Sequence, residues 1–208
     1  GIGEVYGWHY GFGLAGIGML LGQLVFMWGQ KYLKGVGEFI GTKDNPDKDL
    51  MDKPLTKIEK DRVLVLLLSF LIVIVFWGAF EQAGGLMNIY AFEKTNRLID
   101  SINFEVPATW FQSLNAGFIV LFAVAVGKFW SWWKSLGKES ALLFQMAIGV
   151  IIMAIGFFFM SAASLEFQEN GSSAMYWLVL AYLFHTLGEL CTSPTAMALI
   201  TKLAPLKY

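Results

Sequence analysis

The apolar residues of this chain fall into five blocks, separated by polar stretches of unequal length. Each block holds roughly 20 residues, the length that an α-helix needs to cross the hydrocarbon core of a bilayer. Because backbone polar groups inside a bilayer must pair within the protein, we interpret the blocks as transmembrane helices. The predicted helices are Tyr10–Trp28, Val63–Tyr90, Pro107–Trp130, Ala141–Ala162 and Met175–Leu203. The pattern thus predicts an all-α membrane protein with five transmembrane helices.

The composition agrees with this fold class and argues against a nucleic-acid partner. The chain is 56% hydrophobic, with a mean hydropathy of +0.57 and a formal net charge of −1. Such a balanced charge offers no basic surface to nucleic acid, so we expect no nucleic-acid partner. The longest polar stretch mixes lysines with acidic residues, glycines and prolines, which is typical of a solvated linker. We therefore expect one helix in 1–30, a linker in 31–61 and four helices in 62–208.

The basic residues predict the orientation of the chain. Thirteen of the fifteen Lys and Arg residues lie in stretches that the five helices place on one side of the membrane. The other side receives only Lys94 and Arg97. Since basic loops stay on the cytoplasmic side, we expect a multi-pass protein of the cytoplasmic membrane with residues 31–61 in the cytoplasm.

Two carboxylates, Glu81 and Glu189, lie within predicted apolar helices. A charged side chain at that depth is costly unless it faces a partner or water. Acidic residues in membrane helices usually mark the path of a substrate or a proton, so the pattern indicates transport.

The last predicted helix is polar along the face that carries Glu189. His185, Thr186, Thr192 and Ser193 lie three or four positions from Glu189, and Tyr182 lies one turn further along the same face. We interpret this stripe as the lining of a cavity; the alternative is a polar face satisfied against neighbouring helices. Pro194 follows, and its missing backbone donor favours a kink.

The surroundings of Glu81 favour a gate. Gly84 and Gly85 follow it and can let the helix flex, and the predicted orientation places Glu81 in the outer half of the membrane. The third helix brings uncharged hydrogen-bonding side chains to the same level, namely Gln112, Ser113 and Asn115.

Signals for other chemistry are weak. His185 and Glu189 are four residues apart, as two metal ligands could be, but no third ligand stands at motif spacing and HExxH is absent. No GxSxG elbow, phosphate-binding glycine loop or CxxC is present, and Cys191 has no partner for an intrachain disulfide. The helix of Ala141–Ala162 is apolar nearly all round apart from Gln145, so we expect it to meet lipid or the bundle exterior without chemistry.

Four segments together resemble the proton-dependent oligopeptide transporters (POT/PTR), a branch of the major facilitator superfamily. They are GWHYGFGLAGIGM, FWGAFEQAGG, VPATWFQSLNAGF and LGELCTSPTAMALITKLAP, which are similar to the sixth, seventh, eighth and tenth helices of that family. The chain departs from the family at Ala116, where Pro is common, and at Thr195 and Ala196, where Val-Gly is frequent. These departures bear on the subfamily and the substrate range.

The resemblance implies twelve core helices in two six-helix bundles. This chain would supply the last helix of the first bundle and four helices of the second. Glu81 would take part in proton coupling and in a gate ion pair with an Arg of the first helix, while Glu189 would bind the peptide amino terminus. Asn115 would contact the peptide backbone. The further substrate-binding positions carried over are Trp110, Gln112 and Ser193.

The sequence thus predicts part of a proton-coupled symporter of di- and tripeptides, with the proton as coupling ion and no other cofactor. Its expected partners are small peptides, protons, the lipid bilayer and the missing helices of the same transporter. Another small solute, such as nitrate, is the nearest alternative. A membrane-embedded enzyme would need a nucleophile or metal from the missing part, and a structural subunit would tolerate loss of both Glu81 and Glu189.

Overall fold

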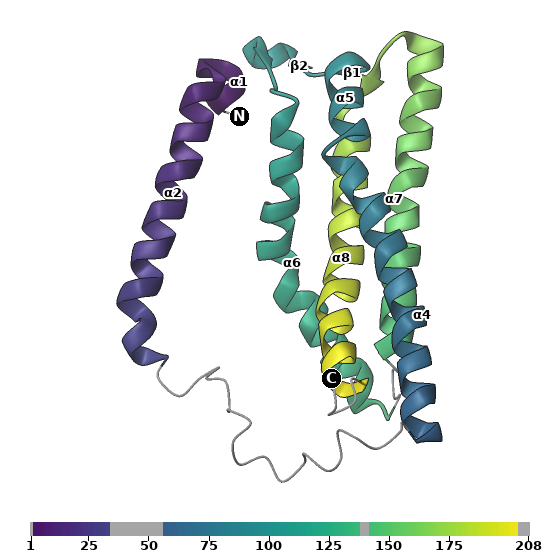
Figure 1. The fold of residues 1–208 in the computed structure, drawn as a ribbon. Helices are drawn as coiled ribbons and strands as arrows, with labels where there is room; N and C mark the ends of the chain where they lie inside the picture. The colour runs from purple at the N-terminus through teal and green to yellow at the C-terminus, as the bar shows by residue number, and fades with distance from the viewer. Residues whose placement is uncertain (1, 34–55, 138–141, 204–208) are drawn as a thin grey trace. The chain divides into compact units, whose positions relative to one another are not determined.

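The computed structural model describes residues 2–33, 56–137 and 142–203 of the 208-residue chain. These residues belong to two compact units that divide between Leu55 and Thr56 (Figure 1). Unit 1 precedes this division and unit 2 follows it.

Unit 1 is one long helix with a short helical segment at either end. Its elements are α1 (Ile2–Tyr6), α2 (Trp8–Gly29) and the 3-10 turn η1 (Gln30–Tyr32). Helix α2 includes the predicted helix Tyr10–Trp28, and none of its side chains is buried among the described residues. A helix this apolar without a buried face needs lipid or further protein to cover it.

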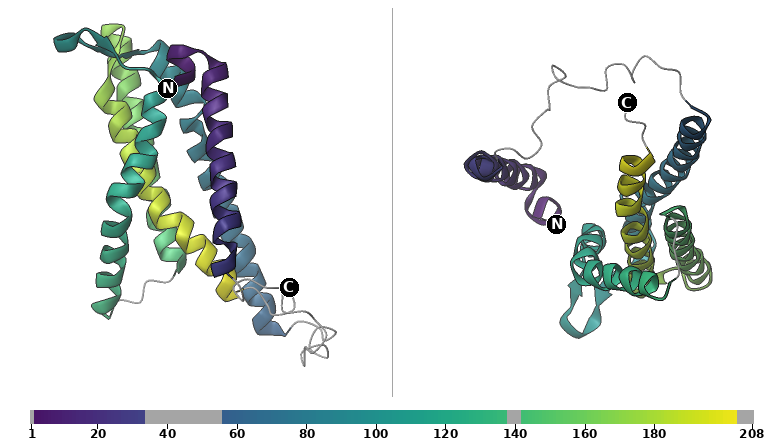
Figure 2. Two further views of the ribbon diagram at one scale, coloured as in Figure 1. Left: turned by 90° about the vertical axis from the view of Figure 1, so that its left-hand side faces the viewer. Right: turned by 90° about the horizontal axis from the view of Figure 1, so that it is seen from below.

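Unit 2 is a bundle of long helices that stand side by side (Figures 1 and 2). Its helices are α4 (Lys57–Phe80), α5 (Leu86–Glu93), α6 (Thr109–Ser135), α7 (Leu142–Asn170) and α8 (Met175–Leu203), with 3-10 turns η3 (Glu81–Ala83) and η4 (Asp100–Ile102). Helix α8 contacts α4, α6 and α7, so it is the central helix of the unit.

Four helical segments of the described residues are long and apolar enough to cross a membrane. They are Trp8–Tyr32, Lys57–Glu93, Thr109–Ser135 and Leu142–Asn170. Helix α8 has the predicted bounds and a length of 29 residues, but it is not among the four. Its polar side chains make it less apolar, and they can be tolerated because α8 lies against protein on several sides. The predicted all-α membrane architecture is confirmed; four of the five predicted spans are candidate membrane helices among the described residues, and α8 is the fifth.

Helix α4 begins at Lys57, ahead of the predicted Val63. The Oγ1 of Thr56 accepts a hydrogen bond from the backbone N–H of Glu59 at 3.3 Å, and the Glu59 carboxylate accepts one from the N–H of Thr56 at 2.7 Å. This capping box starts the helix within the charged residues, because it satisfies two N–H groups that the first turn leaves unpaired. The last residues of the predicted linker 31–61, from Lys57 on, therefore belong to α4. Residues 34–55 of the linker lie outside the described part of the chain.

The predicted helix of Val63–Tyr90 is interrupted in the structure. Helix α4 ends at Phe80, η3 follows, and a turn at Gly84 and Gly85 leads into α5. Gly85 has φ −99° and ψ −94°, far from helical values. The chain thus crosses this region as two helices with a break between them.

Helices α7 and α8 pack closely against each other (Figure 1). A Cβ atom placed on Gly188 would lie 2.6 Å from the carbonyl oxygen of Gly149, so the two backbones touch where both residues are glycine. The residues that α7 buries include Gln145 and Gly149. We expected this helix to meet lipid or the bundle exterior; one of its faces instead packs against α8, because glycines create a contact face that hydropathy alone does not show.

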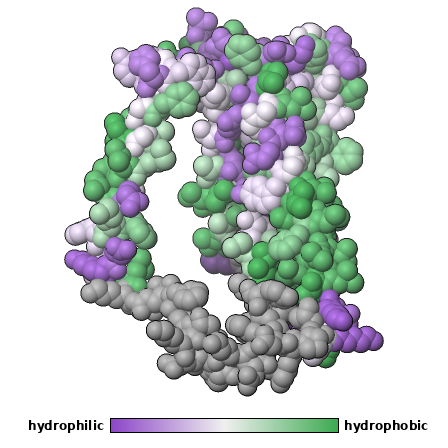
Figure 3. Space-filling view, in the orientation of Figure 1, coloured by the Kyte–Doolittle hydropathy of each residue, from purple (hydrophilic) through white to green (hydrophobic). Residues whose placement is uncertain are grey.

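Short strands join the loops at the end of unit 2 opposite Lys57. Strand β1 (Thr95–Asn96) pairs in parallel with β4 (Ser173–Ala174), and β2 (Leu98–Ile99) pairs antiparallel with β3 (Phe104–Glu105). The buried Ser173 accepts a hydrogen bond from the Tyr90 hydroxyl at 3.1 Å and donates its N–H to the Lys94 carbonyl at 2.9 Å. We call this end of the unit the strand cap; in Figure 3 it is predominantly hydrophilic, whereas the region of α4 below is green.

The close approach of α7 and α8 predicts that Gly188→Ala will destabilise the full-length protein by about 1–3 kcal/mol, since the neighbouring backbone must shift. Thermal unfolding in detergent measures the effect. Gly127→Ala is the matched control on α6, where a Cβ meets nothing within 4 Å. An unfolding temperature for Gly188→Ala equal to that of the control would contradict the packing described here.

Candidate functional site

The helix break exposes backbone carbonyls that two neighbouring helices satisfy. The buried hydroxyl of Tyr182 on α8 donates a hydrogen bond to the carbonyl of Ala83 at 2.9 Å. The side-chain amide of Gln112 on α6 donates to the carbonyl of Gly84 at 3.5 Å. Carbonyls freed in an apolar environment need such partners, so these bonds allow the break to persist there.

A cavity of about 150 Å³ lies at this break. Its lining comes from the end of α4, from η3, and from the facing sides of α6 and α8: Phe80, Glu81, Ala83, Gly84, Gln112, Asn115, Tyr182 and His185. We call it the break cavity. Three of the predicted site residues, Glu81, Gln112 and Asn115, therefore share one cavity although they come from different helices.

Asn115 connects the break cavity to Glu189. Its Nδ2 donates a hydrogen bond to the Glu189 carboxylate at 2.9 Å and lies 3.1 Å from the Thr186 hydroxyl. Thr186 in turn donates to the carbonyl of Tyr182 at 2.7 Å. The amide of Asn115 thus holds the carboxylate of Glu189 in a fixed position on α8.

Neither carboxylate has a basic partner among the residues that the structure describes. The ion pair found in unit 2 joins Arg97 to Glu105 at 2.6 Å, in the strand cap. Glu81 is exposed and Glu189 is half-buried. A cation that pairs with either carboxylate would therefore have to come from outside the described residues.

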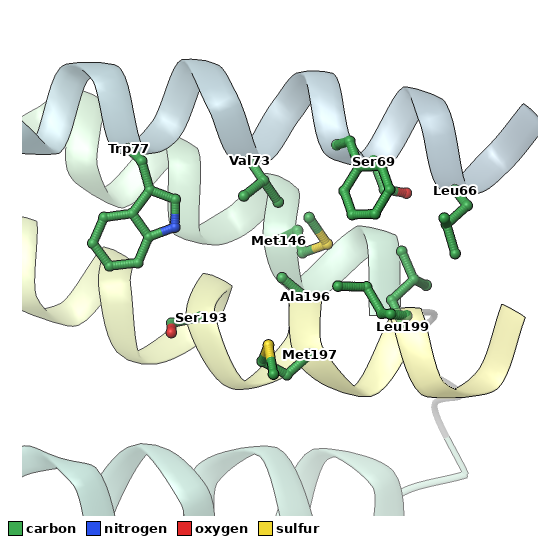
Figure 4. Close-up of a pocket in the computed structure, with 11 residues that line it drawn as sticks. Leu66, Ser69, Val73, Trp77, Met146, Ser193, Ala196, Met197 and Leu199 are labelled. Carbon is green, nitrogen blue, oxygen red and sulfur yellow. The ribbon is translucent and has the colours of Figure 1, made fainter. Parts of the chain in front are cut away.

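Two predicted site residues lie in other places. Ser193 lines a separate apolar cavity of about 170 Å³ between α4, α7 and α8, together with Trp77 and Met146 (Figure 4). Trp110 is 49% exposed and lines a groove between α6 and α8 that also contains Tyr176. The structure does not bring Trp110 or Ser193 to the break cavity.

The predicted polar stripe of α8 is divided among several neighbours. Tyr182 and His185 reach the break cavity and Thr186 contacts Asn115, whereas Thr192 is fully buried against Gly149 of α7. The prediction that one continuous stripe lines one cavity is wrong, because adjacent turns of a central helix face different helices. The helix continues through Pro194, and in the left view of Figure 2 its lower part leans away from the line of its upper part.

Two contributions to the site had little or no signal in the sequence. The bond from Tyr182 to Ala83 joins residues 99 positions apart, and nothing in either segment indicates it. The space that the His185 ring occupies depends on Gly156 of α7, which the sequence shows only as one more apolar position. No group of three metal-ligating side chains forms among the described residues.

The fold and the site define a multi-pass helical membrane protein with one carboxylate, Glu81, at a helix break and a second, Glu189, linked to the cavity there through Asn115. The model of the POT family matches residues 47–208 of this chain. The chain therefore belongs to the POT family.

Known transporters of this family resemble the chain over most of its length. Peptide transporter YePEPT of Yersinia enterocolitica is 29% identical over 97% of this chain and 51% of its own. The di-/tripeptide transporter of Lactococcus lactis subsp. cremoris is 25% identical over 75% of this chain and 31% of its own. A crystal structure of peptide transporter POT, a glutamate-to-glutamine mutant in complex with alafosfalin, superposes with a TM-score of 0.72 at 26% identity, covering 98% of this chain and 50% of that one.

The chain spans about half the length of the most similar of these curated relatives. The match to YePEPT extends over 265 residues, more than this chain contains, so that relative has residues in the matched region that this chain lacks.

The bond between Tyr182 and Ala83 predicts that Tyr182→Phe will lower the stability of the full-length protein by about 1–3 kcal/mol, because a buried carbonyl loses its partner. Thermal unfolding in detergent gives the measurement. Tyr176→Phe, at a half-exposed position of the same helix without a described hydrogen bond, is the control. If both variants unfold at the same temperature, the hydroxyl of Tyr182 does not stabilise the break.

Proposed function

We propose that this chain is part of a proton-coupled symporter that carries di- and tripeptides across the cytoplasmic membrane. One observation carries the proposal: the break cavity contains Glu81, and Asn115 links that cavity to Glu189. The family and the names of the relatives agree with it. Unit 1 would hold the last helix of the first bundle, and unit 2 the first four helices of the second, with residues 31–61 on the cytoplasmic side.

Glu189 is proposed to bind the amino terminus of the peptide. Glu189 is half-buried, and its described partner is an amide, which brings no charge that would neutralise a carboxylate. In surroundings of low dielectric that charge attracts an ammonium strongly, and hydrogen bonds to it are charge-assisted. Asn115 would then orient the carboxylate while its carbonyl oxygen stays available to the peptide backbone.

Glu81 is proposed to carry the coupling proton and to close the gate. Its position at the helix break means that a change in its charge acts where the regular α-helix is interrupted. As a carboxylate it would form the gate ion pair with a basic residue of the first bundle. Protonation would remove that attraction and release the gate, so the proton gradient would drive the conformational cycle.

The charge of the site argues against the alternative solutes. Nitrate is an anion, and two carboxylates without described basic partners would repel it. An enzymatic role has no support in the described residues, where no nucleophile stands beside a base. We therefore propose transport of a zwitterionic peptide and no catalysis.

Glu189→Gln in the full-length protein should weaken dipeptide binding about tenfold to hundredfold, because a charge-assisted hydrogen bond becomes a neutral one. Analogues without the amino group should lose much less. Competition measurements at one fixed pH compare the two ligand classes, with Glu169→Gln on the exposed end of α7 as control. Equal losses for both classes would make Glu189 a structural residue.

Glu81→Gln should abolish accumulation of dipeptide against its gradient while leaving counterflow exchange active, because the amide imitates the protonated carboxyl and cannot release a proton. Reconstituted vesicles with an imposed pH gradient separate the two activities. Glu93→Gln, at the exposed end of α5, should accumulate normally. Gradient-driven accumulation by Glu81→Gln at the unmutated level would refute the role of Glu81.

A further inference from the structure

His185 is a buried titratable residue that the proposed function leaves unused. Its side chain is 1% exposed, and both ring nitrogens lack a hydrogen-bond partner among the described residues. Unpaired polar atoms in a protein interior are destabilising, and a phenyl ring of similar size would avoid the cost. An imidazole in this place therefore calls for a role beyond packing.

The space around the His185 ring is shaped by residues of two neighbouring helices. On the α7 side, the absence of a side chain at Gly156 makes room for the ring, since a Cβ there would lie 2.5 Å from the imidazole Cδ2. The ring of Phe157 stands with its centroid 4.6 Å from that of His185, and the ring of Phe80 at 6.4 Å. The His185 ring is thus packed between aromatic side chains of α4 and α7.

On its other side His185 lines the break cavity together with Glu81. A volume of about 150 Å³ is enough for several water molecules. The side chains of Gln112, Asn115 and Tyr182 give such waters the polar partners that they require. Water in this cavity adjoins the Glu81 carboxyl and the ring of His185; because both ring nitrogens are covered in this conformation, contact between them and the water requires the ring to turn toward the cavity.

We propose that His185 is the proton-exchange partner of Glu81, reached through water in the break cavity; this deepens the proposed proton coupling and rests on it. The O–H bond of the neutral Glu81 carboxyl breaks, the proton passes along the water, and an N–H bond forms on the imidazole. A neutral pair becomes a carboxylate and an imidazolium, with no change in total charge and no oxidation. The reverse transfer restores the first state.

The other titratable groups around His185 are already engaged or lie further along α8. The Tyr182 hydroxyl donates to the Ala83 carbonyl, and Glu189, one turn away, accepts from Asn115. The residues that α7 places against His185 are Gly156 and Phe157, which do not titrate. Glu81 has no side-chain hydrogen bond among the described residues, so it is the carboxyl left to exchange a proton with His185.

The exchange is tested directly by ¹⁵N NMR of histidine-labelled full-length protein in lipid nanodiscs between pH 5 and 8. The His185 signal is assigned by its loss in His185→Gln and, independently, in His185→Phe. The unmutated protein should show the imidazole titrating, with its midpoint moved to lower pH in Glu81→Gln, because a facing carboxylate favours the imidazolium. Glu93→Gln should leave the midpoint unchanged. A ring that stays neutral throughout, or a midpoint that ignores Glu81→Gln, overturns the proposal.

Transport provides the second readout. His185→Gln and His185→Phe should reduce gradient-driven accumulation at least about tenfold and change counterflow exchange less than about twofold, since only proton transfer is lost. Thr192→Val removes another buried hydroxyl of α8 without a described partner, away from the break cavity, and should keep both activities. Full accumulation by both His185 variants would refute the exchange role. If the unmutated protein does not accumulate peptide, the proposed function fails, and the NMR titration still decides whether His185 and Glu81 share a proton.

Discussion

The organisation of unit 2 depends on one constraint, which is that a helix interrupted in apolar surroundings must find partners for the carbonyls it frees. Here the partners come from Tyr182 and Gln112, on two different helices. The same two side chains line the break cavity beside Glu81. The groups that satisfy the backbone are thus the groups that hold α6 and α8 around the carboxyl, so the stability of the break and the geometry of the site have a common origin.

The close approach of α7 and α8 places the polar side chains of α8. Because Gly149 and Gly188 bring the backbones together, α8 is fixed against one neighbour and its remaining faces are directed at α4 and α6. Glu189 reaches Asn115 and His185 reaches the break cavity from this fixed position. Helix α7, which contributes no side chain to the break cavity, therefore determines where the polar side chains of α8 lie.

Apolar length and local spacing carry enough information to predict the long helices and part of the site. The blocks of apolar residues located every long helix, and α8 has the predicted bounds. Glu81, Gln112 and Asn115 were predicted to lie at the same depth in two helices, and in the structure they line one cavity. The separate places of Trp110 and Ser193 did not follow, because the rotation of a helix about its axis depends on packing that a single sequence does not record. The strand cap was missed for another reason, since strands of two residues have no period to detect.

The strand cap determines which half of the broken helix can move. Pairing of β1 with β4, and the bond from Tyr90 to Ser173, fasten the far end of α5 to the start of α8. Helix α5 has eight residues and is roughly 12 Å long, so it is a short helix anchored at one end. Its other end is the turn at Gly84 and Gly85. A rotation of α4 would then pivot at that turn, and Glu81, which lies in η3 on the α4 side of the turn, would move through an arc with α4 while the anchored loops stay in place.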